Sequence, residues 1–324
     1  MHLVLSSFGT VLQRENEQFA VINDEGKKML SPRTVRSISI SKGAKISSDA
    51  VLLAIENEID VMFIDFKGVP QGRVWSVKYG SISTIRKNQM NFIFTPAAVS
   101  WIKDVIASKI DNQIALLLSL GIEDEVLVQR IKNAINRMND YKMKVKQVKG
   151  EVISDIASGL RGWEGSASRV YFETLGMLLP EKYRIEGRTQ HPAKDIFNCL
   201  LNYAYGMLYG KIEGALIKAG IDPYLGIFHR DDYNRPVLVF DVIELFRVWV
   251  DYVVIVLCMQ DVIDEDCYSI KDGVYWLENM GKRILIQSVN DYFDEVISWR
   301  GLERSRATHL TIYAQNLAQM FLKS

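Results

Sequence analysis

The first quarter of the chain is patterned in short apolar segments. From Leu3 to about Val77, apolar residues come in short runs or alternate with polar ones, and turn-forming residues separate the runs. This pattern predicts short β-strands, including FAVI (19–22), RSISIS (36–41) and DVMFIDF (60–66). One segment differs. SSDAVLLAIENE (47–58) has apolar residues at helical spacing behind a Ser or Asp cap, and it predicts a helix.

After about Ser81 the apolar segments become much longer. Residues 101–121, 195–220 and 237–259 all run well past ten residues without strand-like alternation, and they predict helices. Gly121 and Gly220 are suitable C-terminal caps, and Pro236 is a suitable first residue for the third helix. The pattern predicts a two-domain α+β protein. A β-rich, β-sandwich-like domain over residues 1–80 precedes an all-α domain over residues 81–324.

The composition supports two medium domains but identifies no partner. The chain has 324 residues, and 48% of them are apolar, which is enough to bury a sizeable core. Lys plus Arg equals Asp plus Glu at 39 each, so net charge argues neither for nor against a nucleic-acid or membrane partner. Any anion-binding surface has to come from local clustering.

The cysteines and the N-terminus indicate a cellular compartment. Cys199, Cys258 and Cys267 form neither a CxxC pair nor an even set. The N-terminal MHLVLSSFGT lacks the basic region and the long apolar region of a signal peptide. Together they predict a cytoplasmic protein whose reduced thiols are buried as small apolar side chains.

Residues 237–259 are as long as a membrane span, but they contain Asp241, Glu244, Arg247 and Asp251. Each charge near the centre of a bilayer costs roughly 2.5 to 3.5 kcal/mol, so four charges outweigh the apolar gain. We therefore expect a buried helix and no membrane association.

The same four residues form a stripe if the segment is one helix. Their spacings of three, three and four residues place them on one face of an otherwise apolar cylinder. An uncompensated buried charge costs about 3 to 5 kcal/mol, so positive charge must lie opposite the carboxylates. Arg247 and other basic residues in a salt-bridge network are one source. A divalent cation is another, because carboxylate oxygens and an imidazole are suitable ligands.

Two residues elsewhere are candidates to join this stripe. His229 lies fifteen residues before Glu244, ahead of the turn-rich RDDYNRP, and Glu164 precedes the small residues GSAS (165–168). Small residues let another backbone or a ligand come close. Simpler explanations exist for both candidates. His229 could be a structural histidine, and Glu164 could favour its own helix N-terminus through the helix dipole.

Five motifs then follow one another along the chain: SISISKGAKISSDAVLLAIENEIDVMFIDFKGVPQGRVW, WEGSASRVYF, EGRTQHPAKDIFNCLLNYAYGMLYG, AGIDPYLGIFH and RPVLVFDVIELFRVWVD. Over nearly the whole chain they resemble, in order, the motifs of the CRISPR-associated spacer-acquisition integrases, the Cas-one family. Matched motif by motif, the resemblance implies that Glu164, His229 and Glu244 are the metal ligands. Asp241 lies beside them, either supporting the site or contributing to a second ion.

The chain departs from the family pattern in two places. Val237 follows Arg-Pro where family members often have Ser, and Leu245 to Val248 occupy a stretch that often contains Pro. Neither departure touches a proposed ligand. They therefore concern the local helix geometry rather than the chemistry.

The resemblance also implies a function. The C-terminal domain would be the catalytic domain of a metal-dependent DNA endonuclease and integrase of CRISPR adaptation. Mg²⁺ or Mn²⁺ would activate a phosphodiester for attack by a DNA 3′-hydroxyl, joining spacer DNA to a repeat by transesterification, and attack by water would give cleavage. The family further implies a homodimer formed partly through the N-terminal domain, and a complex with a small companion protein, Cas-two.

Basic residues near the proposed ligands, or on helices of the same domain, are candidates for phosphate contacts. They are Arg161, Arg169, Lys211, Arg230, Arg235, Arg247, Lys282 and Arg283. Tyr171, seven residues after Glu164 on the same helix face, is a further candidate for lining the site and contacting DNA.

Two other functions remain open from the sequence. A tyrosine recombinase also breaks and joins DNA, and the chain has 14 tyrosines that include possible nucleophiles. Alternatively, the helical domain is a non-catalytic DNA-binding scaffold whose charged stripe is a structural ion-pair network. Binding of a generic phosphorylated ligand is disfavoured, because no P-loop and no GxGxxG follows a strand.

Overall fold

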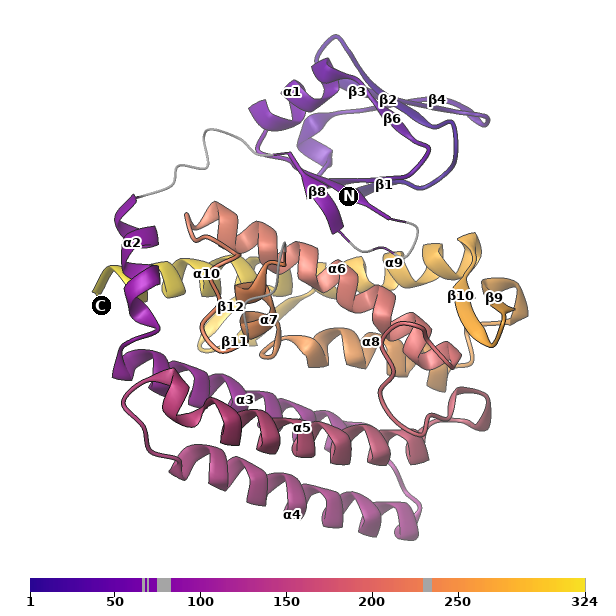
Figure 1. Ribbon diagram of the computed structural model, residues 1–324. Helices are drawn as coiled ribbons and strands as arrows, with labels where there is room; N and C mark the ends of the chain where they lie inside the picture. The colour runs from indigo at the N-terminus through magenta and orange to yellow at the C-terminus, as the bar shows by residue number, and fades with distance from the viewer. Residues whose placement is uncertain (66–67, 69, 75–82, 230–234, 324) are drawn as a thin grey trace. The chain divides into compact units, whose positions relative to one another are not determined.

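The alternating N-terminal segments form two four-stranded sheets in the computed structural model, which describes residues 1–65, 68, 70–74, 83–229 and 235–323 (Figure 1). The chain divides into two compact units, Met1–Gly80 and Ser81–Ser324, and each is described by itself. The first sheet has the order β1 (His2–Leu5), β5 (Ser37–Ser41), β7 (Asp60–Ile64) and β8 (Pro70–Arg73). The second has the order β4 (Gly26–Leu30), β3 (Gln18–Asn23), β2 (Val11–Glu15) and β6 (Lys45–Ile46).

The two sheets share one core. β1, β5 and β7 run parallel, with β8 antiparallel at the edge. The alternation in β5 turns Ile38 and Ile40 inward, where they join Leu12 and Phe19 of the second sheet. Helix α1 (Ser48–Glu56) adds Leu53 to this core, and the Ser47 hydroxyl accepts a hydrogen bond from the Ala50 N–H. The β-rich, sandwich-like fold and the capped helix predicted for this part are confirmed.

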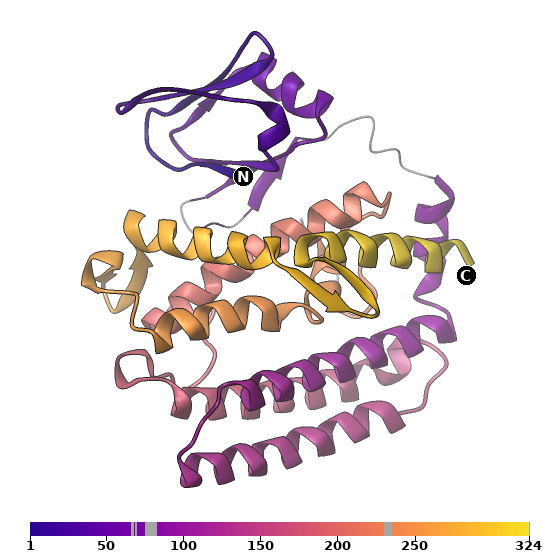
Figure 2. The same ribbon diagram turned by 180° about the vertical axis from the view of Figure 1, so that it is seen from behind.

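The second unit is largely helical, as predicted. Its helices are α2 (Ser83–Phe92), α3 (Pro96–Ser119), α4 (Glu125–Gln147), α5 (Ile153–Leu178), α6 (Ile196–Lys218), α7 (Val237–Ile243), α8 (Arg247–Met259), α9 (Asn279–Asp294) and α10 (Arg306–Lys323). Helices α3, α4 and α5 lie side by side in both views (Figures 1 and 2). Helix α6 is apolar on all sides and packs against α8 and α10.

The predicted glycine caps are present. Gly121 and Gly220 follow the ends of α3 and α6 with φ of +63° and +80°, a left-handed conformation that other residues adopt only with strain. Pro236 lies one position outside the helix, as the N-cap of α7.

The segment 237–259 is not one helix, contrary to the prediction. It breaks after α7, and residues 244–246 form turns in which Leu245 and Phe246 donate to carbonyls three residues back. Asn112 of α3 donates to the Leu245 carbonyl (3.0 Å), and the Phe246 ring packs against Trp249, Trp299 and Tyr313. Tertiary contacts therefore hold the bend.

The helical unit also contains two hairpins that the sequence analysis did not predict. They are β9 (Tyr268–Lys271) with β10 (Val274–Leu277), and β11 (Val296–Trp299) with β12 (Leu302–Ser305). Asp272-Gly273 and Arg300-Gly301 form the two turns, and all four residues have positive φ. Two consecutive positive φ values favour a tight hairpin turn.

All three cysteines are buried and free, which confirms the prediction of core thiols. Among the helices of the described residues, none combines the length and the apolar character needed to cross a membrane.

Candidate active site

Two acids from separate helices meet at a lysine in the helical unit. Glu164 lies near the middle of the 26-residue helix α5, so the explanation that it stabilises its own helix N-terminus fails. Glu244 follows the last residue of α7. The Lys109 ammonium, on α3, contacts Oε1 of Glu164 and lies 2.5 Å from Oε2 of Glu244. The structure therefore brings two of the three predicted ligands together.

Glu244 is held by a second cation as well. Arg247 Nε donates to both Glu244 oxygens at 3.0 Å, and Arg247 Nη2 donates to Oε1 at 2.9 Å. Burial alone would raise the pKa of Glu244, but Arg247 and then Lys109 outweigh burial and hold the pKa well below its usual value. Glu244 is therefore an ionised acceptor at any physiological pH.

Lys109 was not among the predicted site residues. Its side chain is only 6% exposed. Burial would lower the pKa of Lys109, but the carboxylates of Glu244 and Glu164 raise it overall, so the ammonium stays charged. A sequence signal existed, because Lys109 is the one charged residue within the apolar segment VIASKI (105–110) of a long helix.

The third predicted ligand, His229, is oriented by Asp241. The buried Asp241 carboxylate accepts hydrogen bonds from the N–H groups of Ile227 (2.7 Å), Phe228 (3.1 Å) and His229 (2.9 Å). Its Oδ1 also lies 2.7 Å from His229 Nδ1. Asp241 therefore supports the orientation of His229, and a contribution to a second ion stays a prediction.

This contact leaves the other imidazole nitrogen available. His229 Nε2 makes no hydrogen bond within the part of the chain that the structure describes, and the side chain is 36% exposed. Burial would lower the pKa of His229, but the bond to Asp241 and the charges of Asp241 and Glu244 raise it overall. A carboxylate on Nδ1 is the usual support for a histidine that binds metal through Nε2.

Asp251 does not share this site, so the predicted four-residue stripe is wrong. The bend after Glu244 separates the two acids, and Asp251 instead accepts hydrogen bonds from Tyr171 (3.1 Å) and Tyr205 (2.7 Å) in the core. Burial raises the pKa of Asp251 to about 6. Tyr171 has no exposed surface, so the expectation that it contacts DNA is also wrong. It positions Asp251.

The residue types suit a hard divalent cation, but the structure does not bring them together as a metal site, and a lysine lies between the acids. Among the described residues, no group of three or more His, Cys, Asp or Glu is arranged so that it could hold a metal ion. The ammonium of Lys109 instead neutralises both carboxylates. Two carboxylates and an imidazole with Nε2 available are nevertheless suitable ligands for Mg²⁺ or Mn²⁺.

The helix face beside Glu164 is open. A Cβ added at Gly162 or Gly165 would meet nothing within 4 Å among the described atoms, and both glycines are exposed. Ser168, one turn after Glu164, donates to its Oε1 (3.0 Å) and helps to fix the carboxylate. The small residues therefore leave room for a ligand rather than for another described helix.

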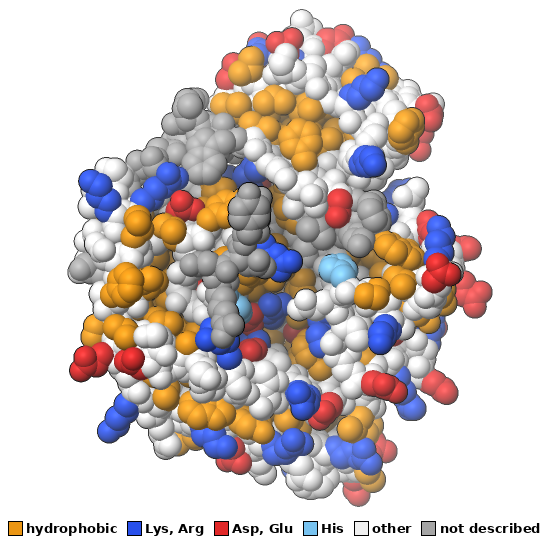
Figure 3. All heavy atoms as spheres, in the orientation of Figure 1, with side chains coloured by type: hydrophobic (Ala, Val, Ile, Leu, Met, Phe, Trp, Pro, Cys, Tyr) orange, Lys and Arg blue, Asp and Glu red, His pale blue; other side chains and the backbone are white. Residues whose placement is uncertain are grey.

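Some of the predicted phosphate-binding residues bond to other residues of the chain, and others are exposed or half-buried. Arg161 donates to the Phe228 carbonyl (3.1 Å), Arg247 binds Glu244, and Lys211 donates to Asn290 (3.1 Å). Arg169, Arg235 and Arg283 are exposed, Lys282 is half-buried, and Arg230 lies outside the described residues. On the face drawn in Figure 3, basic and acidic side chains of the helical unit are interspersed. None of these contacts tests DNA binding, which stays a prediction.

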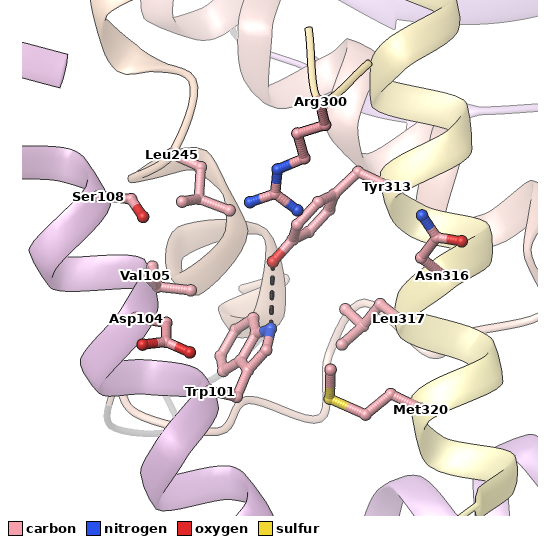
Figure 4. A pocket seen from close by; sticks show the side chains of 10 residues that line it. All are labelled: Trp101, Asp104, Val105, Ser108, Leu245, Arg300, Tyr313, Asn316, Leu317 and Met320. Atoms are coloured by element: carbon pink, nitrogen blue, oxygen red, sulfur yellow. Dashed lines mark hydrogen bonds between the residues drawn. The ribbon is translucent and has the colours of Figure 1, made fainter. Parts of the chain in front are cut away.

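A separate cavity of about 180 Å³ lies between α3, α10 and the bend at Leu245 (Figure 4). The Trp101 indole donates to the Tyr313 hydroxyl (3.1 Å), and Arg300 stacks over the rings of Trp299 and Tyr313. Leu245, in the bend after Glu244, lines this cavity.

A β-rich unit followed by a helical unit with paired acids and an oriented histidine agrees with the sequence matches. The family described as "CRISPR associated protein Cas1" matches residues 3–291. The chain is 30% identical, over 331 residues, to "CRISPR-associated endonuclease Cas1 1" of Archaeoglobus fulgidus, covering 98% of this chain and 95% of that protein. The chain therefore belongs to the Cas1 family.

Solved structures share the fold. A casposase bound to integration product has a TM-score of 0.84 at 20% identity, covering 99% of this chain and 90% of the other. A chain of a Cas6-RT-Cas1–Cas2 complex has a TM-score of 0.82 at 23% identity and is matched over 100% of this chain. The match spans about a third of that longer chain, 35%. At these identities the likeness concerns the fold alone, and it confirms the predicted fold class.

Proposed function

We propose that this chain is a metal-dependent DNA endonuclease and integrase of CRISPR adaptation, which joins the 3′-hydroxyl ends of spacer DNA to a repeat by transesterification. One observation carries the proposal. Glu164 and Glu244 come from different helices and face each other across a buried positive charge, while Asp241 orients His229 with Nε2 available. Membership of the Cas1 family, with relatives named as endonucleases, supports it.

Glu164, His229 and Glu244 would hold Mg²⁺ or Mn²⁺. When bound, the ion would supply Lewis-acid chemistry at the scissile phosphate and the leaving oxygen. The residues of the chain prepare the site. Asp241 keeps a proton on His229 Nδ1, and Arg247 fixes the direction of the Glu244 carboxylate. The open face at Gly162 and Gly165 leaves space for the DNA backbone beside Glu164.

The proposed partners are DNA, a second copy of the chain and Cas2, and the proposed location is the cytoplasm. A similar fold occurs in a casposase described as bound to integration product, and another in a complex that contains Cas2. The proposed division of labour assigns dimerisation to the unit 1–80 and catalysis to the unit 81–324.

The structure disfavours a tyrosine recombinase and is compatible with a non-catalytic scaffold. Tyr171 and Tyr205 are buried, and burial and Asp251 raise their pKa values well above the usual value, so both are poor nucleophiles for a tyrosine recombinase. The Lys109, Arg247, Glu164 and Glu244 network favours the non-catalytic scaffold as the second candidate, because that function needs only ion pairs.

Strand joining in a purified system tests the proposal. The protein, Cas2, a prespacer duplex and a repeat-containing target are incubated with Mn²⁺, and the joined product is measured for wild type, Glu164→Gln and Glu173→Gln. Glu173 is half-buried on the same helix and serves as the control. We expect Glu164→Gln to lower the rate by at least about 100-fold, because a metal ligand is lost. Wild-type joining by Glu164→Gln would refute Glu164 as a metal ligand, and a wild-type protein that joins no strands would favour the scaffold.

A further inference from the structure

Lys109 is the most deeply buried cation in direct contact with the proposed ligands. Its ammonium contacts Glu164 Oε1 and lies 2.5 Å from Glu244 Oε2. Its side chain is 6% exposed and that of Glu244 is 7% exposed. Lys109 is therefore buried between the two acids of the site and is not a surface residue.

The hydrogen bonds of Glu244 leave no vacant oxygen beside Glu164. Oε1 accepts from Nε and Nη2 of Arg247, and Oε2 accepts from Arg247 Nε and contacts Lys109. On the Glu244 side, a metal ion that bridges the two acids has to take Oε2, which Lys109 now contacts, or displace Arg247 from Oε1. Two cations cannot take the same position, because their mutual repulsion adds to the loss of ligand contacts.

We propose that Lys109 is a built-in counter-ion that holds the position between Glu164 and Glu244 in the metal-free protein and leaves it when Mg²⁺ or Mn²⁺ binds. The inference rests on the proposed function, since it takes these two acids as metal ligands. It assigns Lys109 as a positioning residue that keeps the acids together before the ion arrives.

The need for such a residue follows from the burial of Glu244 and the proximity of Glu164, whose side chain is 24% exposed. Two carboxylates from separate helices repel each other, and an uncompensated buried charge costs about 3 to 5 kcal/mol. Arg247 alone cannot neutralise both, because its described ion pair is with Glu244. Lys109 contacts both and cancels the second charge.

A lysine side chain is well suited to being displaced by a metal ion. A lysine ammonium is a point charge on a flexible four-carbon stem and can swing aside, whereas an arginine fork is fixed by its planar hydrogen bonds. Arg247 stacks over the Tyr205 ring (4.7 Å) and binds Glu244 through two nitrogens, so it stays in place. We therefore expect Arg247 to stay in place and Lys109 to move when the metal ion binds.

Calorimetric titration of the full-length, metal-free protein with Mn²⁺ tests this inference. The variants are Lys109→Met, which removes the charge, Lys109→Arg, which keeps it, and Lys103→Met as the control. Lys103 lies on the same helix but donates to the Val148 carbonyl (2.8 Å). We expect Lys109→Met to bind Mn²⁺ at least about tenfold more tightly than wild type, because no ammonium has to be displaced. Lys109→Arg should bind no more tightly than wild type, and Lys103→Met should match it.

Thermal unfolding supplies an independent readout. Metal-free Lys109→Met should unfold at a lower temperature than Lys103→Met and should gain more stability from Mn²⁺. If Lys109→Met does not fold, Lys109→Gln replaces it. The amide of Gln is neutral but still donates hydrogen bonds, so the expectation for Mn²⁺ affinity is the same.

The outcomes separate this inference from the proposed function. If wild type binds Mn²⁺ and the neutral variant binds it no more tightly, the role of Lys109 is refuted and the metal site stands. If only the neutral variant binds Mn²⁺, Lys109 blocks the position permanently, and both its displacement by the ion and the metal site of the wild type are refuted. If neither binds Mn²⁺, both the metal site and the role of Lys109 are refuted.

Discussion

Asp241 has no exposed surface, and its two oxygens take part in four hydrogen bonds with residues 227–229. The sequence predicted that Asp241 lies beside the ligands but left two roles open. Its role depends on three consecutive N–H groups that turn toward one carboxylate, and neither spacing nor composition encodes that turn. Lys109 was not predicted for a similar reason. A lone lysine on an apolar helix can be recognised as a site residue only when the structure shows the two acids that contact it.

Asp241→Asn should lower the free energy of unfolding by about 2 to 4 kcal/mol, because the amide NH₂ faces N–H donors that the carboxylate accepted. Chemical denaturation measures this loss. Asp222→Asn is the matched control, since Asp222 accepts one backbone N–H, from Tyr224, at a more exposed position. A variant as stable as wild type, with the same His229 imidazole NMR signals, would contradict the role given to Asp241.

The raised pKa of Asp251 predicts that the stability of the protein depends on pH. Burial raises its pKa to about 6, above the model-compound value of 3.8. Between about pH 4 and pH 6 the native protein therefore binds more protons at this group than the unfolded chain does. The Asp251 contribution to the free energy of unfolding falls as pH rises through this range and is constant above it.

Asp251→Asn removes this dependence. We expect the stability of the variant, relative to wild type, to increase by about 1 to 3 kcal/mol from pH 4 to pH 7. Urea denaturation at four pH values across this range measures the difference. A stability difference that stays constant with pH would mean that Asp251 titrates normally.

Among the elements, the bend between α7 and α8 decides where Glu244 lies. The pattern of residues 237–259 predicts one continuous helix, because no helix-breaking residue lies inside the segment. The break comes from contacts with distant residues, namely Asn112 of α3 and the aromatic rings around Phe246. Strands and long helices were predictable because their periodicity is local. The Asp-Gly pair at residues 272–273 is also a local sequence signal for a hairpin turn. It was overlooked because long helical segments surround it.

Asn112→Ala tests the bend. The substitution leaves the Leu245 carbonyl without its side-chain donor, and we expect a loss of about 1 to 2 kcal/mol in the free energy of unfolding together with slower strand joining. Asn133→Ala, at an exposed position of α4, should change stability by less than about 0.5 kcal/mol. Equal effects of the two substitutions would show that the Asn112 contact does not hold the bend.

For the molecule as a whole, the division into a β-rich and a helical unit follows from the change in periodicity near residue 80. The site does not follow from periodicity, because Lys109, Glu164 and Glu244 are far apart in sequence and meet only when α3, α5 and α7 pack. Motif resemblance predicted the two acids and His229 as ligands without any knowledge of the geometry. It could not identify the lysine between the acids.

DNA binding should depend on salt and little on base sequence, since the proposed contacts are to phosphates. For Arg169→Ala combined with Arg283→Ala, we expect the slope of log K against log salt concentration to fall in magnitude by about 2, as two exposed arginines are removed. Fluorescence anisotropy at several salt concentrations measures the slope. An unchanged slope would exclude these two residues from the DNA-binding surface.

The position of the metal ion tests the central claim most directly. Crystals grown with Mn²⁺ allow the ion to be located by its anomalous scattering. We expect one peak within ligand distance, about 2.0 to 2.4 Å, of Glu164, Glu244 and His229 Nε2, with the Lys109 ammonium moved from between the acids. A Mn²⁺-saturated crystal in which Lys109 still bridges Glu164 and Glu244, with no ion beside His229, would contradict the account.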